Sequence, residues 1–134
     1  MALGWLSKLI FGKKSGAQVV ATYRSPTEGD KLILEQLRKM GADLEQPREV
    51  LNYLYVSTQE ASHQAAAELR EDGYEVTERE SADAANNPPN PWLVLATKTM
   101  IVDSQSVETM RAKFEKLAAE NHGDYDGWEA AATP

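Results

Sequence analysis

The sequence contains no cysteine among its 134 residues. Disulfide bonds, thiolate nucleophiles and cysteine-based metal or iron–sulfur sites are therefore excluded, and a reducing cytoplasm suits such a chain. Histidine is also scarce: only His63 and His122 occur, and nothing in their spacing brings them together. No G-x-S-x-G, phosphate-binding loop, glycine-rich dinucleotide turn or H-E-x-x-H motif is present. We predict no enzymatic activity, no catalytic residues, no cofactor and no bound metal.

Long apolar runs are absent too: the most hydrophobic run is residues 91–102, and the candidate for membrane contact is residues 1–14. This segment is apolar, aromatic and basic, but it is too short to span a bilayer. Its charge follows the apolar residues, the reverse of a secretory signal. Wound as a helix it is moderately amphipathic, and weak contact with an anionic membrane surface would involve the following residues: Trp5, Leu6, Leu9, Phe11, Lys13 and Lys14. The other interpretation, a helix folded onto its own domain, stays open.

Basic residues are in short supply after the first 24 positions. Residues 1–24 carry four cations and no acid, so the formal charge of −7 leaves −11 on residues 25–134. A phosphate backbone repels such a body, and no lysine or arginine cluster with interleaved aromatics counters this. The charge argues against direct nucleic-acid binding and favours a basic protein partner.

Capping signals and apolar spacing divide the body into alternating elements. Ser25-Pro26-Thr27-Glu28 and Ser57-Thr58-Gln59-Glu60 both place a hydroxyl three residues before a glutamate, which is typical of a helix start. Asp103 caps a third helix with a stripe at Val107, Met110, Phe114 and Leu117. The sequence predicts helices near 25–41, 57–73 and 103–121, and strands near 48–56, 74–80, 91–102 and 123–129.

This order predicts an α+β fold of the ferredoxin-like kind. After the first helix it reads βαββαβ, which suits an antiparallel sheet with two helices on one face and an extra N-terminal helix. We assign residues 1–24 to an amphipathic, basic segment and linker with a short extended run at 18–23, residues 25–130 to the domain and 131–134 to a tail. The other sheet face is then available for binding.

The segment Gly123 to Glu129 is the most distinctive part of the chain. Asp126-Gly127 indicates a turn or bulge, and Tyr125 and Trp128 each combine an apolar ring with a polar group. One interpretation is that these rings seat the last strand on the sheet; the other is a recognition surface. Asp124 and Asp126 also match the start of a calcium loop, but only Glu129 follows among its later acids, so an Asp-Gly turn is favoured.

Three segments together resemble the RraB family of ribonuclease E inhibitors, the regulators of ribonuclease E activity B. They are Asn52 to Val56, Glu71 to Val76 and, above all, Asp124 to Glu129; the similarity covers about residues 28–130. The resemblance implies a ferredoxin-like, acidic domain that binds ribonuclease E as a protein inhibitor in the cytoplasm and alters RNA decay without acting on RNA. The contact residues that we expect are Tyr125, Asp126, Trp128 and Glu129.

One alternative stays open beside this resemblance. Residues 1–14 would suit a peripheral membrane-associated scaffold or adaptor whose partner is not ribonuclease E. The protein would then lie at the inner membrane surface.

Overall fold

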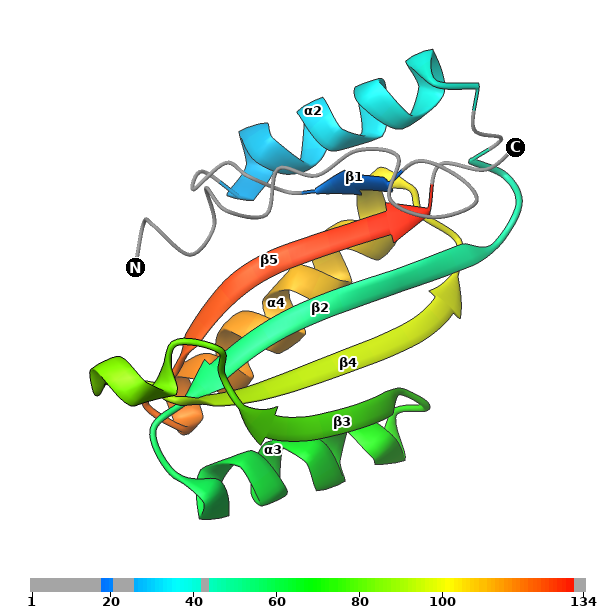
Figure 1. The fold of residues 1–134 in the computed structure, drawn as a ribbon. Helices are drawn as coiled ribbons and strands as arrows, with labels where there is room; N and C mark the ends of the chain where they lie inside the picture. Colours follow the sequence, from blue (N-terminus) through cyan, green and yellow to red (C-terminus); the bar gives the residue numbers. More distant parts are fainter. Residues whose placement is uncertain (1–17, 21–25, 42–43, 132–134) are drawn as a thin grey trace.

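The computed structural model describes residues 18–20, 26–41 and 44–131. Their strands form one five-stranded antiparallel sheet in the order β1-β5-β2-β4-β3 (Figure 1). The strands are β1 (Gln18–Val20), β2 (Arg48–Val56), β3 (Glu75–Glu80), β4 (Trp92–Met100) and β5 (Asp124–Ala131), and the helices are α2 (Pro26–Lys39), α3 (Gln59–Glu71) and α4 (Ser104–Glu120). A short 3₁₀ turn, η1 (Ala84–Asn86), lies in the loop between β3 and β4. None of the described helices is long and apolar enough to cross a membrane.

The ferredoxin-like prediction is confirmed by the order of the strands. Helix α3 joins β2 to β3 with β4 between them, and α4 joins β4 to β5 with β2 between them. Helix α2 is the extra N-terminal helix. Strand β1 adds to the outer edge of β5, with Val20 opposite Glu129. The predicted extended run at 18–23 is thus present at 18–20, and its remaining residues lie outside the described part.

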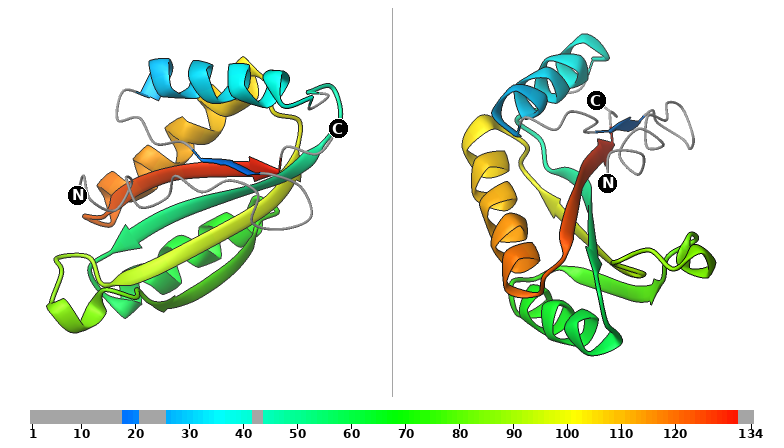
Figure 2. Two further views of the ribbon diagram at one scale, coloured as in Figure 1. Left: turned by 45° about the horizontal axis from the view of Figure 1, so that its top comes forward. Right: turned by 90° about the vertical axis from the view of Figure 1, so that its left-hand side faces the viewer.

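Helices α3 and α4 lie on the same face of the sheet, and α2 lies beside α4 (Figure 2). The burial of side chains along β2 shows that the described helices cover only one face of the sheet. From Arg48 to Val56 every second side chain is buried, while those between are more exposed. The predicted stripe of α4 is buried at all four positions, so it forms core as expected. The largest fully buried side chains of the core include Leu37, Leu54, Leu69, Phe114 and Trp128.

Side-chain caps fix where two of the helices begin. The Thr58 hydroxyl accepts a hydrogen bond of 3.0 Å from the backbone N–H of Ala61, and an Asp103 carboxylate oxygen accepts one of 2.8 Å from Ser106 N–H. Both satisfy donors that have no partner within the helix. The hydrogen bonds from Ser106 also lower the pKa of Asp103. The predicted cap at Asp103 is confirmed, whereas the cap predicted at Ser57 lies one residue later, at Thr58.

Gly123 lets β5 start directly beside β2. A Cβ atom at this position would lie 2.3 Å from the carbonyl oxygen of Tyr55 and 2.9 Å from Cγ1 of Val56. The first of these contacts is with backbone, which a rotamer change cannot move. We therefore expect Gly123→Ala to destabilise the fold by about 2 kcal/mol, within the range for overpacked sites, measured by urea unfolding.

His122 supplies the matched control, because it has a φ of 53°, which favours glycine. His122→Gly should change stability by less than about 1 kcal/mol, since relief of the strained φ opposes the added freedom of the unfolded chain. Equal losses in the two variants would show that the close approach of Gly123 to β2 does not matter.

A candidate protein-binding face

The sheet face turned away from α3 and α4 carries tyrosines and carboxylates. In an antiparallel pair, residues directly opposite one another share a face. Tyr53 lies opposite Leu95, and Tyr55 lies opposite Leu93 on one side and Asp124 on the other. We call this surface, made by residues 51, 53, 55, 93, 95, 124, 126 and 129, the open face. No helix among the described residues covers it (Figure 2).

A β-bulge in β5 decides which residues reach the open face. The register between β2 and β5 shifts between Asn52 and Leu54, so both Asp126 and Gly127 oppose Tyr53. Gly127 has a φ of 102°, which glycine adopts at little cost. Tyr125 and Trp128 are three positions apart, and a regular strand would place them on opposite faces. The extra residue puts both rings on the helix side.

Trp128 is a core residue held by a hydrogen bond. Its indole is fully buried, and Nε1 donates to Oδ1 of Asp30 in α2 over 3.0 Å. Arg111 of α4 donates to both oxygens of the same carboxylate, from Nε and Nη2, each over 3.0 Å. Bidentate, charge-assisted pairs of this kind are strong and directional. We call Asp30, Arg111 and Trp128 the carboxylate lock; it ties α2, α4 and β5 together.

Tyr125 connects Arg111 of this lock to Asn52 in the central strand β2. Its ring stacks on Phe114 with centroids 5.3 Å apart, and the Arg111 guanidinium lies 5.2 Å from its centroid. The hydroxyl donates to Oδ1 of Asn52 over 2.5 Å. Burial raises the pKa of Tyr125 well above its usual value, so the phenol stays neutral.

The two carboxylates of the distinctive segment lie on the other side of the strand. Glu129 accepts a hydrogen bond from the hydroxyl of Tyr53. Asp126 lies close enough to Tyr55 that its charge, after burial, is the next cause of that phenol's raised pKa. Both carboxylates are 8% exposed, beside the rings that line the open face. The structure thus divides the four predicted contact residues: Asp126 and Glu129 lie on the open face, Tyr125 and Trp128 behind it. A contact between any of them and a partner stays a prediction.

Sequence reasoning missed the residues that hold this arrangement. Asp30 and Arg111 are 81 positions apart, and each sits in a helix where a charged residue is ordinary. The sequence did indicate that Tyr53 and Tyr55 lie on the same face, because side chains two positions apart on a strand point the same way.

Metal and membrane sites gain no support from the described geometry. Among residues 18–20, 26–41 and 44–131, no three histidine, aspartate or glutamate side chains are grouped so as to hold a metal ion. His63 contacts Glu78 through Nδ1 over 2.5 Å, at the surface. The predicted membrane-contact residues, Trp5 to Lys14, lie outside the described residues.

The family is decided by comparison with known protein families. The family described as regulator of ribonuclease activity B, or RraB, matches residues 27–130 of this chain. The chain belongs to this family. No curated protein matches the sequence directly. The match begins in α2 and ends in β5, so the RraB domain includes the whole carboxylate lock.

Disruption of the carboxylate lock in this RraB domain should lower stability, and the losses from its two charged members should not add. We expect Asp30→Leu and Arg111→Met each to lower the free energy of unfolding by about 3–5 kcal/mol, because each leaves a buried charge without its partner. The double variant should lose clearly less than the sum. Denaturant unfolding measures all three.

Glu115→Gln is the control for that cycle. Glu115 also pairs with Arg111, over 3.3 Å, but its side chain is 51% exposed, so the loss should stay below about 1 kcal/mol. Additive losses in the Asp30 and Arg111 variants would contradict the lock.

The tyrosines predict how stability depends on alkaline pH. Burial is the first cause that raises the pKa of Tyr53, Tyr55, Tyr74 and Tyr125 above the usual 10.0. A raised pKa contributes stability that is fully present below pH 10 and is lost as pH rises above it. Phenolate absorbance at 295 nm should therefore appear together with the loss of far-ultraviolet circular dichroism. Ionisation of several tyrosines at pH 10 in a fully folded protein would contradict this.

Proposed function

We propose that this protein binds ribonuclease E and inhibits it, acting in the cytoplasm as a non-enzymatic regulator of RNA decay. Membership of the RraB family supports a role in regulating ribonuclease activity. The finer assignment rests on the chemistry of the open face, which suits contact with another protein.

The observation that carries the proposal is the grouping of Tyr53, Tyr55 and Leu95 with the carboxylates of β5. Tyrosine is enriched at the energetically important centres of protein interfaces, because it offers a broad apolar ring and a polar end at little entropic cost. Strand β2 holds both rings, and the neighbouring strand β4 holds Leu95, on hydrogen-bonded backbone. Such a face binds without needing to reorganise.

Charge supports the same kind of partner. Asp124, Asp126 and Glu129 all come from β5, at the margin of the tyrosine cluster. Residues 25–134 as a whole carry −11. A basic segment of the nuclease would be steered to these carboxylates at the β5 side of the open face.

The direct test is inhibition of RNA cleavage by purified ribonuclease E. The wild-type protein should slow cleavage of a model RNA, and Asp124→Lys should weaken binding about tenfold, because it reverses a charge beside Tyr55. The affinity of the complex is measured by calorimetry and the inhibition by the cleavage rate.

Glu108→Lys is the matched control. It makes the same charge change at an exposed position of α4, on the helix side of the sheet. Melting temperatures must show that both variants stay folded. Equal weakening by the two changes would reject the open face, and a wild-type protein that neither binds nor inhibits would reject the function.

A further inference from the structure

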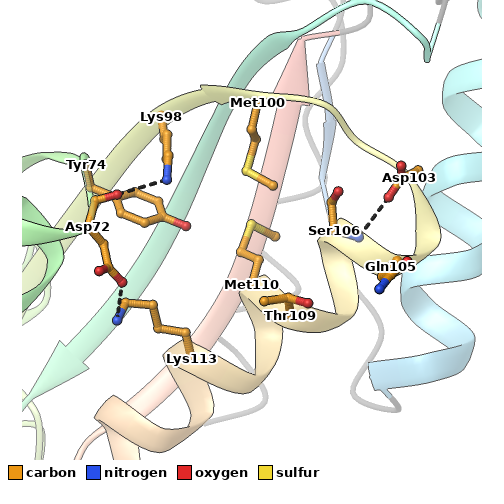
Figure 3. Close-up of a pocket in the computed structure, with 10 residues that line it drawn as sticks. All are labelled: Asp72, Tyr74, Lys98, Met100, Asp103, Gln105, Ser106, Thr109, Met110 and Lys113. Atoms are coloured by element: carbon orange, nitrogen blue, oxygen red, sulfur yellow. Dashed lines mark hydrogen bonds and ion pairs between the residues drawn. The ribbon is translucent and has the colours of Figure 1, made fainter.

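A groove lies on the helix side of the sheet, away from the open face. It opens between the turn after α3, the end of β4 and the first turns of α4, with a volume of about 470 Å³ (Figure 3). Pockets for small ligands usually range from about 300 to 1,000 Å³. Its lining residues are Asp72, Tyr74, Lys98, Met100, Asp103, Gln105, Ser106, Thr109, Met110 and Lys113.

The base of the groove is apolar. Met100 of β4 and Met110 of α4 point toward one another across it (Figure 3). Beside them, the Tyr74 ring is fixed by an edge-on contact with Phe114, with centroids 5.5 Å apart. Methionine side chains adapt to the shape of what they contact. This base therefore suits an unbranched apolar chain.

One end of the groove carries two lysines, Lys98 and Lys113, beside the Asp72 carboxylate. Lys98 Nζ donates to the backbone oxygen of Asp72 over 2.9 Å and lies 4.9 Å from the centroid of the Tyr74 ring. Lys113 pairs with the Asp72 carboxylate, and Glu68 lies farther away at 3.8 Å. The hydrogen bond that Lys98 donates therefore goes to a neutral carbonyl group and not to a carboxylate. Each ammonium group carries three donors, so both have donors to offer to a second carboxylate.

We propose that this groove binds a small monocarboxylate with an apolar body. The chain of the ligand lies between Met100 and Met110, and its carboxylate accepts hydrogen bonds from Lys98 and Lys113. Attraction to two cations selects an anion, while burial of the chain adds affinity with each methylene group. The site is separate from the open face and does not depend on the proposed function.

Methyl-labelled methionine provides a direct readout, because the chain has only four methionines. In the full-length protein, octanoate should shift the methyl signals of Met100 and Met110 to saturation and leave that of Met40 in place. Octylammonium, which has the same chain and the opposite charge, should bind at least tenfold more weakly. Acetate, which lacks the chain, should give no saturating shift.

Substitutions of the two lysines test the assignment of the carboxylate. Lys98→Gln and Lys113→Gln should each weaken octanoate binding about tenfold, as expected for loss of a charge-assisted hydrogen bond. Lys116→Gln is the control: it removes the same charge from α4 at an exposed lysine that pairs with Glu120. Melting temperatures should change little in all three, because the hydrogen bond of Lys98 and the ion pairs of Lys113 and Lys116 are at the surface.

Three results would overturn the proposal. They are equal binding of octanoate and octylammonium, shifts of the Met40 methyl signal of the same size, and unchanged affinity in both Lys98→Gln and Lys113→Gln.

Discussion

The carboxylate of Asp30 is the point on which this structure depends. It receives one hydrogen bond from the Trp128 indole and two from the Arg111 guanidinium, in a part of the molecule that is largely shielded from water. An isolated carboxylate would be costly there, and only the full set of donors makes the site favourable. Since the three partners come from α2, α4 and β5, this one group fixes the extra N-terminal helix to the ferredoxin-like core.

The lock also determines which residues of β5 lie on the open face. Trp128 is held from behind by Asp30, so the bulge at Asp126-Gly127 is needed to keep both aromatic rings of β5 on that side. The same bulge sends Asp126 and Glu129 to the open face beside Tyr53 and Tyr55. The rings of the Tyr-Asp-Gly-Trp segment hold the strand against the helices, and its Asp126 lies with Glu129 on the open face that we propose as the partner surface.

The sequence predicted the arrangement of the elements well, because periodicity and caps are local signals. The capping residues Thr58 and Asp103, and the alternation in β2, each report on their immediate neighbours. The lock could not be predicted in this way, since its two charged members are 81 positions apart.

The division of β5 between two faces could not be predicted either. Asp-Gly indicated a bulge, but the face that each later residue takes depends on where the bulge lies in the register with β2. A shift of one residue exchanges the two faces of a strand. The four predicted contact residues therefore do not share one face: Trp128 is fully buried on the helix side, and Asp126 and Glu129 lie on the open face.

We propose that the open face, and not the helix side, meets ribonuclease E. The most direct measurement is nuclear magnetic resonance of the labelled tyrosine rings as unlabelled nuclease is added to the full-length protein. The ring signals of Tyr53 and Tyr55 should shift or broaden, and those of Tyr74, which lines the groove on the helix side, should stay in place. A response of Tyr74 without one from Tyr53 and Tyr55 would contradict this account.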